Sequence, residues 1–213
     1  MAESDPITVT IWSDVVCPFC NVARERARWL SERDMRIEWL PFDLHPEYPP
    51  EGIAREDLMR RYPASMHEAV RGMHEDAQMV YNPNPDVVPN TRRALELIEW
   101  ARGRGGHTAL HQRVMDAYWT EGRDITGWDV LADCVRDVGL DPDEARAEVD
   151  AGTFADRVTA STETAQRLGI SGVPAFVFDG RLLVSGAQPH AVMEQAIAQV
   201  ARMRAEEEKA AAG

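Results

Sequence analysis

The segment ITVTIWSDVVCPFC, residues 7–20, determines the predicted fold. Residues 7–12 are apolar and rich in β-branched side chains, which is typical of a strand. A helical pattern follows at residues 18–33, and alternating apolar and polar side chains at residues 35–42 indicate a second strand. A strand, a helix and a strand in this order predict a β-α-β unit with parallel strands and a right-handed crossover.

Two thiols, Cys17 and Cys20, lie three positions apart at the predicted start of this helix. Free backbone N–H groups and the positive end of the helix dipole stabilise a thiolate at that place. The thiolate is the nucleophile of disulfide exchange, and the spacing lets the second thiol attack the first after a mixed disulfide has formed. Pro18 fits the first helical turn, because its missing N–H would have no partner there. The motif therefore predicts a redox-active dithiol.

Residues 51–152 differ in character from the β-α-β unit. Prolines and a glycine at residues 49–52 mark the break. Apolar side chains then recur at helical spacing, and residues 141–144 (Asp-Pro-Asp-Glu) form a strong helix start. This stretch predicts an all-helical insertion.

A helix, two strands and a last helix are predicted after the insertion. Residues 173–178 indicate a strand, Asp179-Gly180 a tight hairpin turn, and Pro189 the start of the last helix. The complete order, β-α-β, insertion, α-β-β-α, predicts an α/β protein with a thioredoxin-like fold and a mixed sheet.

The predicted domains follow from this order. We expect residues 1–50 and 153–205 to form the thioredoxin-like domain and residues 51–152 to form the helical insertion. Residues 206–213, rich in glutamate and alanine, are expected to form a disordered tail.

Val173-Pro174 is a second candidate feature, because proline at the start of a strand normally weakens the strand. A cis peptide bond before Pro174 would turn the chain sharply and leave the backbone of Val173 free to pair with an extended substrate. The alternative is a trans proline at a strand edge.

Two segments, DVVCPFC at residues 14–20 and GVPAFVF at residues 172–178, resemble the paired motifs of DsbA-like thiol:disulfide oxidoreductases. The segment VSGAQP at residues 184–189 resembles the FrnE-type branch of that family. The resemblance extends from about residue 7 to residue 200 and includes the inserted helices. It implies that Cys17 is the attacking thiol, Cys20 the resolving thiol and Pro174 a cis proline.

The chain departs from the DsbA pattern between the two cysteines. Periplasmic DsbA enzymes have a histidine where this chain has Phe19. Phenylalanine neither donates a hydrogen bond nor places a charge near the Cys17 thiolate, so we expect a less oxidising couple. The resemblance also implies that Pro18, Phe19, Val173 and Pro174 bind substrate.

Asp14 precedes the cysteine motif and is a candidate proton relay. Turned inward, its carboxylate would serve the resolving thiol Cys20. The alternative is an exposed carboxylate at the end of the strand.

These residues predict an enzyme, a protein thiol:disulfide oxidoreductase that exchanges or isomerises disulfides through Cys17 and Cys20. The expected substrates are proteins or small thiols and disulfides. One alternative is a glutathione-dependent isomerase or transferase of the kappa or hydroxychromene-carboxylate isomerase type. Such families resemble the chain overall but usually carry serine where Cys17 stands. A non-catalytic binding or chaperone module is the third alternative.

Composition narrows the remaining function classes. The 213 residues carry a formal net charge of −13, which argues against nucleic-acid partners and anionic membranes. Zinc sites usually have four ligands, and Cys134 is the only thiol besides the pair, so we expect no metal. We also expect no cofactor, with glutathione as a candidate substrate only. No signal peptide is visible, which predicts a cytoplasmic protein, and the oligomeric state stays open.

Overall fold

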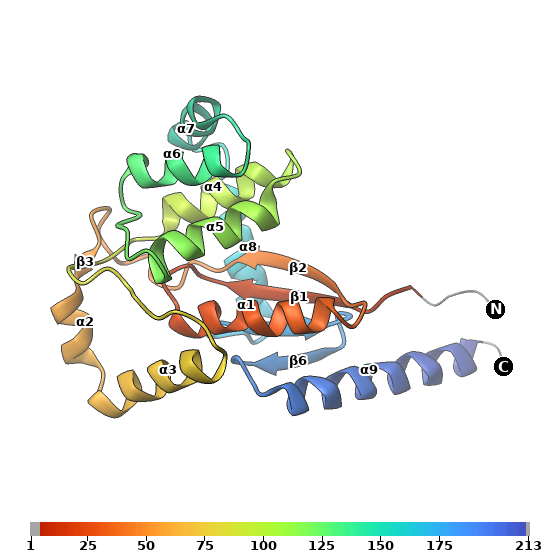
Figure 1. Cartoon of the computed structure of the whole chain (residues 1–213). Helices are drawn as coiled ribbons and strands as arrows, with labels where there is room; N and C mark the ends of the chain where they lie inside the picture. The colour runs from red at the N-terminus through yellow and green to blue at the C-terminus, as the bar shows by residue number, and fades with distance from the viewer. Residues whose placement is uncertain (1–4, 212–213) are drawn as a thin grey trace.

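A four-stranded mixed sheet forms the centre of the computed structural model, which describes residues 5–211 (Figure 1). The strand order is β2-β1-β5-β6. The parallel neighbours β1 and β2 flank the crossover helix, whereas β5 pairs antiparallel with both β1 and β6. The strands are β1 (Thr8–Ser13), β2 (Arg36–Pro41), β5 (Ala175–Phe178) and β6 (Leu182–Ser185). The predicted α/β fold with a thioredoxin-like mixed sheet is therefore confirmed.

Three helices cover the two faces of this sheet. Figure 1 shows α1 (Pro18–Ser31) in front of the sheet and α8 (Ala155–Arg167) behind it. The third helix, α9 (His190–Ala211), shares a buried apolar core with α1 and with the side chains of β1 and β5 that face them. A smaller core beneath α8 includes Trp12 and Phe42. The central strands β1 and β5 are apolar on both faces because they are buried between layers, whereas the edge strands β2 and β6 are partly exposed.

The insertion contains six helices and one short ribbon. Its elements are β3 (Ile53–Ala54), α2 (Arg55–Arg61), α3 (Ala64–Asp76), β4 (Val87–Val88), α4 (Arg92–Arg102), α5 (His107–Trp119), α6 (Trp128–Asp137) and α7 (Pro142–Asp150).

The prediction that the insertion is all-helical is wrong at β3 and β4, which pair antiparallel. Their apolar, mostly β-branched residues favour extended backbone. Gly52 permits the close approach, because it has a φ of +81° and a Cβ there would lie 2.4 Å from the carbonyl oxygen of Val88. The boundaries predicted for the domains stay a prediction.

The insertion packs directly against the cysteine motif. One continuous apolar core joins Val15, Val16, Cys17 and Cys20 to the buried faces of α4, α5 and α6. The indole N–H of Trp119 in α5 donates to the carbonyl of Val15 at 2.7 Å. The position of the motif therefore depends on the insertion as well as on the sheet.

Helices α2 and α3 are attached more lightly than the others. They lie on the side of the sheet where α1 begins (Figure 1). No residue of α2 is buried, and α3 buries only Val70 and His74. Met59 of α2, Met66 of α3 and Tyr62 between the two helices are exposed.

The predicted disordered tail is wrong for residues 206–211, which continue α9. Alanine and glutamate favour a helix, and Nη2 of Arg181 lies 2.6 Å from Oε2 of Glu207. Residues 212–213 of the predicted tail lie outside the described residues. Within residues 5–211, every helix is too short or too polar to span a lipid bilayer.

Removing the N-cap of α7 should destabilise the protein by about 1 kcal/mol. Asp141 accepts hydrogen bonds from the N–H groups of Asp143 at 2.9 Å and Glu144 at 3.3 Å, and Asp141→Ala removes both. Urea unfolding of the variant measures the loss. Asp143→Ala is the matched control, because its side chain does not cap the helix, and an equal loss in both variants would contradict the assignment.

Candidate active site

Cys17 is the N-cap of α1, and Cys20 lies in the first turn. The carbonyl of Cys17 accepts from the N–H groups of Cys20 at 3.0 Å and Asn21 at 3.2 Å. This geometry places the Cys17 side chain at the positive end of the helix. Cys17 is only 4% exposed and Cys20 is fully buried, so Cys17 is the sulfur that a substrate can approach.

The structure brings Val173 to the cysteine motif across 156 residues. The Cys17 thiol donates to the carbonyl of Val173 at 3.3 Å. The Val173–Pro174 peptide bond is cis, and the carbonyl of Pro174 accepts from the N–H of Gly186 at 2.8 Å. Strand β5 begins directly after Pro174, so its pairing with β1 carries this turn to the start of α1.

Burial raises the pKa of the Cys20 thiol well above its ordinary value. The neighbouring Cys17 raises this pKa further through a hydrogen bond and its charge, while the backbone N–H of Asp14 opposes the rise. Cys20 is therefore a protonated thiol in this structure, and it must lose its proton before it can attack.

Asp14 is fully buried, and its carboxylate joins three segments. It accepts from the N–H of Val16 at 3.1 Å, the N–H of Leu44 at 2.8 Å and the hydroxyl of Thr91 at 2.7 Å. Burial raises the pKa of Asp14 to about 6 although these hydrogen bonds lower it. The carboxylate's hydrogen bonds within residues 5–211 do not include Cys20, so the relay role stays a prediction.

A cavity of about 260 Å³ opens beside the Cys17 sulfur, and we call it the Cys17 cavity. Its walls are the start of α1, the inner sides of α2 and α3, and a set of aromatic side chains. The aromatic residues are Phe19, Tyr48, Tyr62, Tyr81, Tyr118 and Trp119. Phe19 and Val173 also line a second, more open hollow of about 520 Å³ beside Pro174. The predicted substrate-binding residues therefore separate the two spaces.

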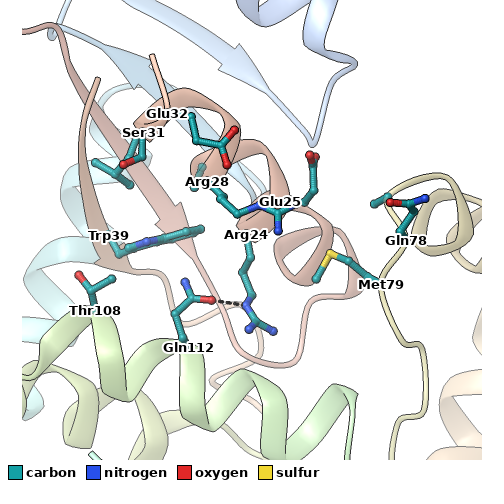
Figure 2. A pocket seen from close by; sticks show the side chains of 13 residues that line it. Arg24, Glu25, Arg28, Ser31, Glu32, Trp39, Gln78, Met79, Thr108 and Gln112 are labelled. Carbon is teal, nitrogen blue, oxygen red and sulfur yellow. Dashed lines mark hydrogen bonds between the residues drawn. The ribbon is translucent and has the colours of Figure 1, made fainter. Parts of the chain in front are cut away.

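A larger hollow of about 540 Å³ lies away from the cysteines, between α1, β2, α5 and the end of α3 (Figure 2). One of its two arginines is already paired, because Arg24 donates from Nε to Gln112 at 2.5 Å and from Nη2 to Asp116 at 2.7 Å. No cysteine lines this hollow. The reactive thiol therefore places the chemistry at the smaller Cys17 cavity.

Several residues at the site carry no local signal in the sequence. Leu44 and Thr91 contact Asp14 from two separate loops, and Tyr48 and Arg55 line the Cys17 cavity. Their roles arise from tertiary contacts, so neither spacing nor composition marks them. Among the described residues, no cluster of three or more histidine, cysteine or acidic side chains is arranged to hold a metal ion.

Comparison with known proteins agrees with this architecture. The chain is 28% identical over 196 residues to the protein YwbO of Bacillus subtilis strain 168, which covers 90% of this chain and 96% of YwbO. A probable DsbA oxidoreductase from Streptomyces coelicolor superimposes with a TM-score of 0.83 at 25% identity, over 91% of this chain and 89% of that one. A 2-hydroxychromene-2-carboxylate isomerase has a TM-score of 0.76 at 18% identity, over 93% and 98% of the two chains, and shares the fold.

The family model for the DSBA-like thioredoxin domain matches residues 8–198. This range includes both cysteines of the motif, the Val173–Pro174 turn and the whole insertion. With the Cys17 thiol at the start of α1 and against Val173, the chain belongs to the DSBA-like thioredoxin domain family.

Proposed function

We propose that the protein is a thiol:disulfide oxidoreductase that works through the Cys17–Cys20 dithiol. One observation carries the proposal: Cys17 caps α1, its sulfur lies against the Val173 carbonyl, and Cys20 is buried in the same helical turn. This arrangement supplies one accessible nucleophile and one protected resolving thiol. Membership of the DSBA-like family supports an enzyme of this class.

The exchange proceeds in two displacement steps. The Cys17 thiolate attacks one sulfur of a substrate disulfide, forms a mixed disulfide and releases the first substrate thiolate. Cys20 then loses its proton and attacks the Cys17 sulfur, which forms the Cys17–Cys20 disulfide and releases the second thiolate. The dithiol supplies two electrons and the substrate thiolates take up two protons. A dithiol reductant restores the reduced pair.

The residues around the sulfurs support roles in binding. Pro18 and Phe19 follow Cys17 in the first turn of α1. Val173 and Pro174 lie on the opposite side of the sulfur, directly before strand β5. We propose that these four residues hold the substrate disulfide against Cys17. Asp14 is proposed to accept the Cys20 proton, which is supported by its burial and by a pKa of about 6.

A redox titration in glutathione buffers tests the proposed function. The Cys17–Cys20 pair should give one two-electron transition, near about −270 mV for a reductase or about −120 mV for an oxidase. Insulin reduction by the wild-type protein and by Cys17→Ser provides the activity test. Full insulin reduction by Cys17→Ser would contradict the proposal.

Phe19→His should make the pair more oxidising. An imidazole N–H in the first turn would favour the Cys17 thiolate and hence the reduced form. A tenfold preference corresponds to about 30 mV, so we expect the reduction potential to rise by about that amount. The glutathione titration measures the rise. Phe19→Leu is the control, because it stays apolar, and an equal rise in both variants would attribute the effect to lost packing instead.

A glutathione-dependent isomerase or transferase is the second candidate. The observation that favours it is the Cys17 cavity, which suits a small organic substrate. The buried resolving thiol Cys20 argues against it, because that chemistry needs no second sulfur. Turnover of 2-hydroxychromene-2-carboxylate with glutathione, without mixed-disulfide formation and with full retention in Cys20→Ser, would favour this candidate.

A further inference from the structure

We propose that the disulfide reduced at Cys17 is a small molecule with an aromatic or otherwise apolar body and one anionic or hydrogen-bond-accepting group, bound in the Cys17 cavity. The inference rests on the proposed function and names its substrate class. It follows from the access to the sulfur, the apolar walls and the single guanidinium that lines the cavity.

Access to Cys17 limits the size of the substrate. The residue is 4% exposed, and its sulfur lies beside a cavity of about 260 Å³ rather than on an open surface. Sites for drug-sized ligands typically measure about 300–1,000 Å³, so this cavity holds one small molecule. A disulfide within a polypeptide carries main chain on both sides of each cysteine. The cavity walls built by α2 and α3 leave little room for that chain, and Cys17 does not line the more open hollow beside Pro174.

The walls select for apolar groups. Leu44, Leu58, Val70 and Val88 line the cavity together with its aromatic side chains. Burying unpaired charge against such walls is costly. Glutathione disulfide carries carboxylates and ammonium groups on both halves, whereas an aromatic disulfide buries its ring against these residues. The cavity therefore favours an aromatic or apolar disulfide over glutathione disulfide.

A buried tyrosine hydroxyl is one donor beside the cavity. Tyr48 is 4% exposed, and its hydroxyl has no hydrogen-bond partner among the described residues. Its ring is fixed by stacking on His45 at 4.4 Å. Burial raises the pKa of Tyr48, so the hydroxyl keeps its proton and can donate. A buried donor without a partner is costly, which favours a side-chain movement that brings this almost inaccessible hydroxyl to a ligand acceptor in the cavity.

Arg55 supplies the positive charge. Among the lysines and arginines of residues 5–211, it alone lines the Cys17 cavity, and it forms no ion pair with a carboxylate there. Its Nε donates to the carbonyl of Asn84, and its Nη2 donates to the hydroxyl of Tyr118 at 2.6 Å and to the carbonyl of Val87 at 3.4 Å. These bonds hold the guanidinium at the cavity wall, and within residues 5–211 its Nη1 has no partner and can meet a ligand. A single carboxylate on the substrate would complement this charge.

Single-turnover kinetics of the reduced protein test the inference. The probes are dithiobis(nitrobenzoate), dithiodipyridine, glutathione disulfide, hydroxyethyl disulfide and insulin. Each rate is divided by the rate of mercaptoethanol with the same disulfide, which removes differences in intrinsic reactivity. We expect the two aromatic probes to exceed glutathione disulfide and insulin by at least about tenfold.

Two variants locate the effect in the cavity. Leu58→Trp fills the cavity and should slow both aromatic probes by about tenfold while hydroxyethyl disulfide, which is much smaller, changes little. Leu168→Trp is the matched control, because Leu168 is 57% exposed and lies outside the cavity, and it should change no rate. Arg55→Gln should slow dithiobis(nitrobenzoate), which carries carboxylates, more than dithiodipyridine, which carries none.

The outcomes separate the inference from the proposed function. Equal or faster normalised rates with insulin or glutathione disulfide, unaffected by Leu58→Trp, would overturn the substrate class and leave the redox function standing. Wild-type rates no faster than those of Cys17→Ser with every probe would overturn the function itself. Circular dichroism checks the fold of Leu58→Trp, and Met66→Trp at the entrance replaces it if that variant does not fold, with the same expected result.

Discussion

Replacing Cys20 with serine will trap the protein as a mixed disulfide on Cys17 and lower multiple-turnover reduction by at least about 10³-fold. Well-oriented intramolecular groups reach effective molarities of about 10⁵ M, whereas an external thiol at millimolar concentration must replace Cys20 in the variant. The first displacement needs only Cys17 and stays intact. Mass spectrometry of the variant after mixing with a disulfide will show one bound substrate half.

Burial predicts which sulfur carries the adduct. Cys17 faces the Cys17 cavity, while Cys20 and Cys134 are fully buried. Cys134→Ser is the matched control, because the pKa of the Cys134 thiol is raised to about 11 by burial and its sulfur faces the carbonyl of Arg113. This control should turn over as the wild type does. An adduct on Cys134, or unchanged turnover by Cys20→Ser, would contradict the assigned roles.

The β-α-β unit could be predicted because its signals are local. The strand expected at residues 7–12 is β1, the helix expected at residues 18–33 is α1, and the strand expected at residues 35–42 is β2. Alternation of apolar side chains depends only on which face of an element is buried. Local pattern therefore determines these elements to within two residues.

Other elements of the chain were predicted less well from local sequence pattern. The strand expected from residue 173 begins at Ala175, because Pro174 has no N–H to donate to the ladder. The β3–β4 ribbon was missed, since two-residue strands produce no periodicity. Helical propensity in the last residues was underestimated, although glutamate and alanine favour helix and Glu207 pairs with Arg181. Short or tertiary-dependent elements thus escape sequence reasoning.

The two cysteines and the Val173–Pro174 turn could be proposed from the sequence because each belongs to a contiguous motif. The part of the site that α2, α3 and the aromatic side chains build around the Cys17 cavity could not be proposed in this way. Tyr48 precedes the insertion, Arg55 and Tyr118 come from separate parts of it, and the three meet only after α2 packs against the ribbon and α5. The proposed substrate class depends on this part of the site, so it is argued from the structure rather than from the motif.

Stability should fall by about 3 kcal/mol as ionisation of Asp14 is completed between about pH 4 and pH 7. The carboxyl has an ordinary pKa of 3.8, and burial raises it to about 6 in the folded protein. The folded protein therefore holds this proton more tightly than the unfolded chain does. The resulting stabilisation is complete below pH 3.8 and is lost as the pH rises through about 6. Many paired surface carboxylates have the opposite dependence, so the effect must be measured as a difference.

Comparison with Asp14→Asn isolates this contribution. Asparagine cannot ionise, and its amide nitrogen replaces one acceptor oxygen, so the variant loses a hydrogen bond to Val16, Leu44 or Thr91 at every pH. That loss costs about 1–3 kcal/mol and does not depend on pH. Urea unfolding from pH 3 to pH 8 should therefore show the wild-type advantage shrinking by about 3 kcal/mol.

The same comparison decides whether Asp14 can serve Cys20. A group that exchanges a proton near neutral pH must titrate there. If the wild-type advantage in unfolding free energy over Asp14→Asn stays constant from pH 4 to pH 8, Asp14 does not titrate in that range. Asp143→Asn on the exposed start of α7 is the matched control, because it makes the same substitution outside the hydrogen bonds of Asp14. If Asp14 titrates near pH 6, single-turnover resolution of the Cys17 mixed disulfide should lose its pH dependence in that range in Asp14→Asn. The rate of resolution could instead keep its pH dependence in Asp14→Asn while the pH-dependent difference in unfolding free energy is present. Asp14 would then hold the loops of Val16, Leu44 and Thr91 together and would not move the Cys20 proton.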